Sequence, residues 1–285
     1  MQTALNAFIT AKTASNRSER TLEKYQDIIG RFIASAGSVP LETLQPESIE
    51  AWLAGHRKTG KSPETILTYY TSLSTWLNWC ERRYRLEYNP IEDIDRPRIP
   101  KRLPPYLKDH EVTALLAGTQ RMLNHLKAEA ILRFLLDTGA RAGEVCAIHR
   151  RNIDLEAKTV LLLGKDQEER CVPIGEKTIA ALCLYWQGRL DTLPHAFHAY
   201  NGPFTVRGIR SLVRRAAAYG EIARGVYPHL LRHTFAHNWL IGGGDLESLR
   251  RILGHSNLQT TQRYSGMAIQ DIQEKHSRIR PGDRF

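Results

Sequence analysis

The sequence predicts a mainly α protein: an N-terminal helical bundle, then a helix-rich α+β domain with one small antiparallel sheet. Three observations lead to this prediction. Over the first 100 residues, apolar side chains recur at spacings of three and four, the period of amphipathic helices. A proline-rich stretch at 89–105 then interrupts the pattern, because proline disfavours both helix and sheet. After it, helical patterns resume around one short group of strand-like segments at 153–174.

The first domain is expected to hold four helices. One covers residues 2–12, and a second is capped by Ser18 and ends near Gly37. Pro46 opens the third and Pro63 the fourth, because proline suits the first helical turn, where its missing N–H leaves no bond unmade. Four helices with connections this short make a small bundle.

The proline-rich stretch is expected to be extended and to separate two domains, since proline-rich segments favour extended backbone. The predicted boundaries are 1–97 for the first domain, 98–106 for the linker and 107–285 for the second domain.

The second domain combines helices with a hairpin. Asp109 is the expected N-cap of a helix ending at Leu116, and further helices are expected over 128–138, 144–147, 177–189 and 206–219. Strands are expected over 153–155, 159–163 and 170–174, with residues 164–169 forming the hairpin loop.

Composition indicates a globular protein with a basic surface. The 285 residues are enough for two hydrophobic cores, and the net charge of +10 suits a polyanionic partner such as nucleic acid. No apolar run reaches the length of a membrane span, and the N-terminus lacks a signal-peptide pattern. We therefore expect a cytoplasmic protein with no membrane partner.

Residues 227–264 gather the chemically most capable side chains. His229 and Arg232 are three residues apart and share a helix face. Gly242–Gly244 should end that helix, because glycine is unfavourable in helix interiors. A second helix, capped by Asp245, should end at Gly254, placing His255 at a helix C-terminus that favours a protonated imidazole. Tyr264 follows nine residues later.

This order of residues resembles the tyrosine recombinase (phage integrase) family. In that family an arginine is followed by a hairpin lysine, His-x-x-Arg, a His or Trp, and a nucleophilic tyrosine. The corresponding residues here are Arg141, Lys165, His229, Arg232, His255 and Tyr264, in segments that read TGARAGE, GK, HLLR and LGHSNLQTTQRY. With no further N-terminal domain in view, the pattern is that of the simpler, two-domain, Xer-like members.

The resemblance implies that DNA is cut through a 3′-phosphotyrosine. Tyr264 would be the nucleophile, and Arg141 and Arg232 would hold the non-bridging oxygens of the phosphate, which guanidinium groups match as forks. Lys165 would protonate the leaving 5′ oxygen. Storing the phosphodiester energy in a tyrosine ester needs neither a metal nor another cofactor.

Supporting roles follow from the same resemblance. His229 and His255 would hydrogen-bond the phosphate or move protons. Glu144 and His233 would orient the reacting side chains by hydrogen bonds without contacting the DNA themselves. The first domain would be the core-binding (SAM-like) DNA-binding domain, and the second the catalytic domain. The expected partner is double-stranded DNA with paired half-sites, bound by a dimer on each site and a tetramer in the synapse.

Two further segments carry expectations about partners. Four basic residues at predicted helix ends could reach phosphates: Lys58, Lys61, Arg82 and Arg83. The alternative is that each is ordinary solvated charge. The stretch 267–280 is amphipathic and would be the exchange helix, docking on a neighbouring protomer; packing on its own domain is the alternative.

Other functions stay open at this point. A type IB topoisomerase shares the chemistry but acts as a monomer, and a catalytically silent regulator would bind DNA without cutting it. The spacing of His229, His233 and His237 could also suggest zinc, although no Cys lies near and no Glu occupies the metalloprotease position.

Overall fold

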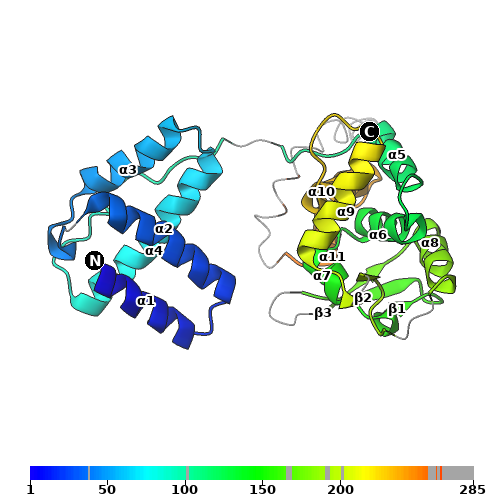
Figure 1. The fold of residues 1–285 in the computed structure, drawn as a ribbon, viewed down its shortest axis with the longest axis horizontal. Helices are drawn as coiled ribbons and strands as arrows, with labels where there is room; N and C mark the ends of the chain where they lie inside the picture. The colour runs from blue at the N-terminus through cyan, green and yellow to red at the C-terminus, as the bar shows by residue number, and fades with distance from the viewer. Residues whose placement is uncertain are drawn as a thin grey trace, which may run out of the picture. The chain divides into compact units, whose positions relative to one another are not determined.

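The computed structural model describes residues 1–37, 39–100, 103–164, 169–189, 193–199, 202–255, 261 and 264. The chain forms two compact units, Met1–Lys101 and Arg102–Phe285, and their boundary lies inside the stretch 98–106. Helices dominate both units and the strands pair only in small antiparallel sheets (Figure 1), which confirms the predicted fold class.

The first unit is a bundle of helices around one apolar core. Its helices are α1 (Gln2–Ala14), α2 (Glu19–Ala36), α3 (Pro46–Lys58) and α4 (Pro63–Tyr84), with a short 3-10 turn η1 (Leu41–Thr43). Phe8, Phe32 and Trp76 are fully buried in this core. Burying a side chain such as Phe stabilises the fold by roughly 1.5–3 kcal/mol. The apolar stripes of the sequence therefore meet as expected.

The helix starts of the first unit follow the predicted signals. Pro46 and Pro63 are the first residues of α3 and α4. The hydroxyl of Ser62 accepts a hydrogen bond from the Thr65 N–H at 3.3 Å, and so caps α4.

The second unit wraps helices around the buried helix α6. Its helices are α5 (Asp109–Thr119), α6 (His125–Thr138), α7 (Ala142–Ala147), α8 (Glu176–Gln187), α9 (Val206–Tyr219), α10 (Pro228–Ile241) and α11 (Leu246–Leu253), with a 3-10 turn η2 (Arg150–Asn152). Figure 1 shows α6 between α8 and α10, both of which contact it. Ile131, Phe134 and Leu135 of α6 are fully buried.

Several predicted helix starts were wrong; α7 begins at Ala142 rather than at residue 144, and α8 at Glu176 rather than at 177. Lys108, not Asp109, is the N-cap of α5, because Glu111 lies three residues later and its carboxylate accepts from the Lys108 N–H at 2.8 Å. Helix α6 begins at His125 rather than at residue 128.

The main sheet has three antiparallel strands in the order β1-β2-β3: β1 (Ile153–Asp154), β2 (Thr159–Leu163) and β3 (Glu169–Pro173). Val160 pairs with Val172 and Leu162 with Arg170. Both residues of the first pair and Leu162 are buried, so one face of the hairpin covers the core. A second pair, β4 (His198–Ala199) and β5 (Gly202–Pro203), was not predicted, since two residues are too few for an alternating pattern.

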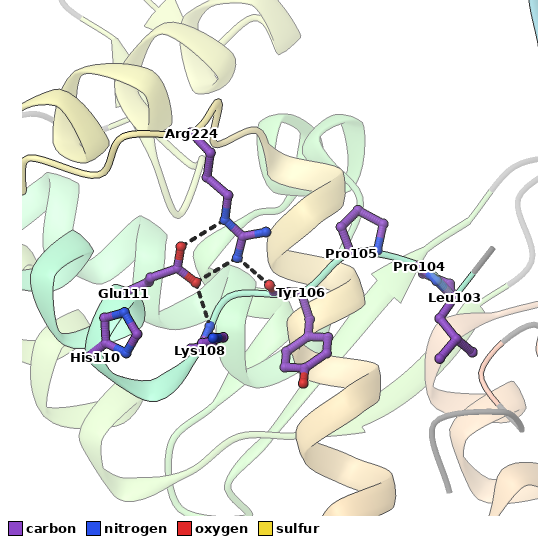
Figure 2. A pocket seen from close by; sticks show the side chains of 8 residues that line it. All are labelled: Leu103, Pro104, Pro105, Tyr106, Lys108, His110, Glu111 and Arg224. Atoms are coloured by element: carbon purple, nitrogen blue, oxygen red, sulfur yellow. Dashed lines mark hydrogen bonds and ion pairs between the residues drawn. The ribbon is translucent and has the colours of Figure 1, made fainter. Parts of the chain in front are cut away.

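The chain enters the second unit along α10 and is held there by Arg224 (Figure 2). The Arg224 guanidinium pairs with both carboxylate oxygens of Glu111, at 2.8 and 2.6 Å, and also donates to the Tyr106 carbonyl. The Tyr106 ring stacks on His237 at 3.4 Å, and the Leu107 N–H donates to the Thr234 hydroxyl at 2.9 Å. Tyr106, Glu111 and Arg224 line an open pocket of about 480 Å³, and none of the predicted site residues lines it.

Candidate active site

Arg232 is the most deeply buried of the predicted phosphate ligands. It lies on α10 and is only 1% exposed. Its two terminal nitrogens donate to the carbonyls of Gly139 and Leu253, each at 2.6 Å. Burial, together with repulsion from Arg141, lowers the pKa of the Arg232 guanidinium to about 9, so it stays charged at neutral pH. A buried cation close to a second cation favours binding of an anion.

Gly139 is needed where Arg232 is anchored. It follows α6 with φ of 60°, in the left-handed region that glycine adopts freely. A Cβ here would lie 2.6 Å from the Phe235 ring and 2.9 Å from the Leu253 side chain. Glycine therefore lets the end of α6 approach α10 and α11 closely enough for its carbonyl to meet Arg232.

The C-terminal end of α11 collects arginines from four segments. The last carbonyls of a helix have no partner within the helix and carry partial negative charge. Here four consecutive carbonyls each accept from a different guanidinium: Ile252 from Arg170 at 2.7 Å, Leu253 from Arg232 at 2.6 Å, Gly254 from Arg141 at 3.2 Å and His255 from Arg250 at 2.9 Å. Arg141 and Arg232, the two predicted phosphate ligands, are thus held on neighbouring carbonyls.

Glu144 contacts both the backbone and the guanidinium of Arg141. Its side chain is 6% exposed, while that of Arg141 is 40% exposed and faces solvent. Glu144 accepts from the Arg141 backbone N–H at 2.7 Å and from its guanidinium at 2.9 Å. Burial raises the pKa of Glu144, but hydrogen bonds from Arg170 and then Arg141 outweigh burial and hold the pKa below its usual value.

His255 follows α11 and bridges two site residues. Its Nε2 lies 3.0 Å from an Arg232 nitrogen and its Nδ1 lies 2.9 Å from the Thr261 hydroxyl. Because a guanidinium can only donate, a hydrogen bond from Arg232 uses the tautomer of His255 in which Nε2 accepts. Arginines, rather than the His255 ring, occupy the carbonyls at this end of the helix, and the protonated state of His255 stays a prediction.

Tyr264 is buried, at 1% exposed, with its hydroxyl 2.6 Å from His233 Nδ1. The Tyr264 N–H donates to the Thr261 carbonyl at 3.0 Å, which ties the tyrosine to the residue that contacts His255. His229 is exposed at the start of α10, and its ring lies edge-on to His233 at 4.6 Å. The structure thus brings together five of the six predicted reacting groups.

The sixth, Lys165, lies outside the described residues. So does the stretch 267–280, the predicted exchange helix. The described residues place only the strand ends that flank the lysine, Leu163 of β2 and Glu169 of β3.

The three histidines of α10 do not converge. His233 contacts Tyr264, whereas His237 stacks on Tyr106, and burial lowers the pKa of His237. In the part of the chain that the structure describes, no group of three His, Cys, Asp or Glu side chains could hold a metal ion.

The four basic candidates of the first unit do not form one cluster. All are exposed, but Lys58 and Lys61 precede α4 while Arg82 and Arg83 lie in its last turn. A helix of 22 residues places its ends roughly 33 Å apart. The four residues therefore form two separate basic pairs, one before the start of α4 and one at its end.

Sequence reasoning missed Arg170 and Thr261. Arg170 lies on β3 and pairs with both oxygens of Glu144, at 2.8 and 2.7 Å. Thr261 is fully buried beside His255. Their positions in the sequence could have indicated that they lie near the site. Arg170 closely follows the predicted hairpin with Lys165, and Thr261 lies between His255 and Tyr264.

Comparison with known proteins agrees with this geometry. The model of the phage integrase family matches residues 105–270. A tyrosine recombinase XerC from Xanthomonas axonopodis pv. citri (strain 306) is 29% identical over 252 residues, covering 87% of this chain and 82% of the relative. The XerC of Bacillus subtilis (strain 168) is 29% identical over 279 residues, covering 93% and 92%.

Solved structures share the fold. The Tn1549 transposon integrase in complex with transposon right end DNA aligns with a TM-score of 0.79 at 19% identity, covering 92% of this chain and 93% of the integrase. A lambda integrase dimer bound to a COC′ core site aligns with a TM-score of 0.78 at 15% identity, covering 91% and 96%.

The fold and the matches define a tyrosine recombinase of the Xer-like type, an enzyme of site-specific DNA recombination. The chain belongs to the phage integrase family. No helix among the described residues is both long and apolar enough to cross a membrane.

Proposed function

We propose that this protein cuts and rejoins double-stranded DNA at paired half-sites, with Tyr264 as the nucleophile. The observation that carries the proposal is the pair of guanidiniums, Arg141 and Arg232, held on adjacent carbonyls despite their mutual repulsion. Such a pair matches the two non-bridging oxygens of one phosphodiester. His255 contacts Arg232, and His229 lies against His233, which contacts Tyr264; both histidines would serve as hydrogen-bonding groups.

The proposed reaction has two transesterifications. The Tyr264 oxygen bonds to phosphorus and the bond to the 5′ oxygen breaks, with that oxygen taking a proton from Lys165. A 5′ hydroxyl from a second strand then attacks the phosphotyrosine and releases Tyr264. Arg141 and Arg232 stabilise the charge that builds on the phosphate, at about 3–4 kcal/mol for each donor.

A nicked suicide substrate tests the proposal directly. Loss of the short fragment after the cut prevents religation and traps the covalent adduct. We expect one protein to become attached to each cleaved 3′ phosphate. Binding of the DNA without any adduct would instead support a silent regulator.

Replacing Lys165 with alanine should slow cleavage of ordinary DNA but not of DNA whose 5′ bridging oxygen is sulfur. A thiolate leaves without needing a proton, so a general acid becomes dispensable. Single-turnover cleavage of the two substrates measures this difference. Equal defects on both would assign Lys165 another role.

The exposed arginines on one face of helix α9 support the proposal that the partner is DNA. Arg207, Arg210 and Arg214 lie three and four residues apart and are exposed on one face, while Ile209 and Val213 are buried on the other. None of the three arginines has an ion pair with a described residue. Helix α9 packs against α7, which begins directly after Arg141. The transposon and lambda integrases with this fold were both solved on DNA.

Replacing Arg207, Arg210 and Arg214 together with alanine should weaken DNA binding and reduce its salt dependence. Each lost phosphate contact lowers the slope of log K against log salt by about one. Binding titrations at several salt concentrations would measure the slope. The matched control removes the exposed Arg151, Lys158 and Lys177, from η2, the turn before β2 and α8, and should keep it. Equal slopes for both triple variants would exclude α9 from the interface.

The first unit, by this proposal, is the core-binding domain and the second the catalytic domain, so that DNA is bound by both. The four basic residues at the two ends of α4 would contact phosphates at two points along the duplex. We expect the protein to act in the cytoplasm.

We further propose that a dimer occupies each site and a tetramer forms the synapse, linked by residues 267–280 docking on neighbours. A cyclic, head-to-tail arrangement closes a ring of protomers. Deleting residues 268–285 should leave binding to one half-site unchanged and remove cooperativity between two. Gel shifts on single and paired half-sites measure this, and unchanged cooperativity would exclude docking in trans.

A further inference from the structure

We propose that Arg170 is a positioning residue of the recombination reaction, which keeps the Glu144 carboxylate from withdrawing Arg141 from the scissile phosphate. This inference rests on the proposed function. Arg170 would touch neither the DNA nor the tyrosine; it would act through Glu144 and through the end of α11.

The contacts of Arg170 use its whole guanidinium. Two nitrogens bind the two oxygens of Glu144, at 2.8 and 2.7 Å, and Nε donates to the Ile252 carbonyl at 2.7 Å. The Arg170 side chain is 10% exposed, against 40% for Arg141. The exposed guanidinium of Arg141 can therefore reach a phosphate, whereas the buried guanidinium of Arg170 holds Glu144 in place.

The sharing of Glu144 decides how much of Arg141 is available. Glu144 Oε1 accepts from both Arg170 and Arg141, at 2.8 and 2.9 Å, while Oε2 accepts from Arg170 and from the Arg141 backbone N–H. Arg141 therefore has only one side-chain contact with the carboxylate, and its other terminal nitrogen donates to Gly254. Without Arg170, the carboxylate would be free to form a two-point pair with Arg141, which guanidinium and carboxylate groups favour.

Arg170 also joins three segments of the site. It lies on β3, directly after the hairpin that contains Lys165, and it binds α7 through Glu144 and α11 through Ile252. Gly254 permits this approach, because a Cβ there would lie 3.1 Å from Arg170 Cδ. Lysine could not replace it fully, since one ammonium cannot make the same fork and the third contact together.

The test compares cleavage of two suicide substrates by Arg170→Lys and Arg170→Ala. In one substrate the scissile phosphate is normal; in the other it is a methylphosphonate, which carries no negative charge. Replacing a residue that acts through Arg141 should slow cleavage of the charged phosphate only, whereas a general loss of structure should slow cleavage of both substrates. Arg133→Lys and Arg133→Ala are the matched controls, because Arg133 pairs with Glu129 elsewhere in the same unit.

We expect both Arg170 variants to bind DNA normally. Both should cleave the normal substrate about 30- to 100-fold more slowly than the unaltered protein, a smaller loss than the roughly 10²- to 10³-fold effect of removing a donor that contacts the reacting group directly. On the methylphosphonate, the cleavage rates of both variants should come within about threefold of the rate of the unaltered protein, because this substrate carries no negative charge for Arg141 to stabilise. A tenfold difference in rate would correspond to about 1.4 kcal/mol of activation free energy. Equal losses on both substrates, or no loss on the normal one, would overturn the inference.

A double variant gives the same answer without modified DNA. If Glu144 captures Arg141 when Arg170 is gone, then adding Glu144→Gln to Arg170→Ala should recover part of the lost cleavage. A purely structural role predicts a further loss in the double variant, which would overturn the proposal. Failure of the unaltered protein to cleave would instead contradict the proposed function, so the two failures are distinguishable.

Discussion

A Tyr264→Phe protein is expected to form no covalent adduct with a nicked suicide substrate while binding the same DNA almost unchanged. Phenylalanine keeps the ring and its buried packing and removes only the hydroxyl, which is the atom that would bond to phosphorus. The loss should be complete, because no other hydroxyl stands in its place among the described site residues. Denaturing gels resolve the adduct, and gel shifts measure binding.

The structure also predicts the side effect of this substitution. The Tyr264 hydroxyl lies 2.6 Å from His233 Nδ1, and losing one such hydrogen bond costs about 1 kcal/mol of folding free energy. The melting temperature should therefore fall slightly, with the fold kept. Tyr185→Phe, at a buried tyrosine of α8, is the control and should form adduct normally. Adduct formation by Tyr264→Phe would remove Tyr264 from the role of nucleophile.

Arg232→Ala is expected to slow single-turnover cleavage by about 10²- to 10³-fold, the effect of losing one donor to a developing negative charge. Arg141→Ala should slow it by a similar factor. The two should differ in stability. Arg232 is buried and holds the ends of α6 and α11, whereas the Arg141 side chain is 40% exposed. Arg232→Ala should therefore lower the melting temperature clearly and Arg141→Ala much less.

Arg232→Lys separates catalysis from folding. Lysine keeps the positive charge but has a single ammonium in place of the two terminal nitrogens that bind the two carbonyls. We expect it to be more stable than the alanine variant and still slow. Cleavage within threefold of the unaltered protein by either Arg232 variant would place that residue outside the phosphate site.

The sequence was most informative where local chemistry sets the structure. The Gly242–Gly244 break, the Asp245 cap and the Gly254 end all act within one or two turns, and α10 ends and α11 begins and ends where predicted. The side chain of Asp245 accepts from the Ser248 N–H at 2.8 Å, as an N-cap should. The order of motif residues then indicated which of these elements carry the site.

What the sequence could not supply was the partner of each charged side chain. Arg170 lies in a short strand after acidic residues, and its partner Glu144 is 26 residues earlier. Nothing in local periodicity reports such a distance. For the same reason, Lys58 and Arg83 looked equivalent as helix-end charges, although Lys58 ends α3, before the start of α4, and Arg83 lies in the last turn of α4. Only the packing of the chain decides which charges meet.

The end of α11 makes the site sensitive to the length of that helix rather than to its side chains there. The four acceptors are backbone carbonyls of residues 252–255, so, Gly254 apart, they do not depend on which side chains these positions carry. Adding or deleting one residue within α11 would instead turn its end by about 100°. Arg141, Arg170 and Arg232, which come from other segments, would then lose their carbonyls at once, and with them the alignment of Arg141 and Arg232. Homologous chains are thus expected to keep the length of α11, because the register of its last turn sets the positions of these carbonyls.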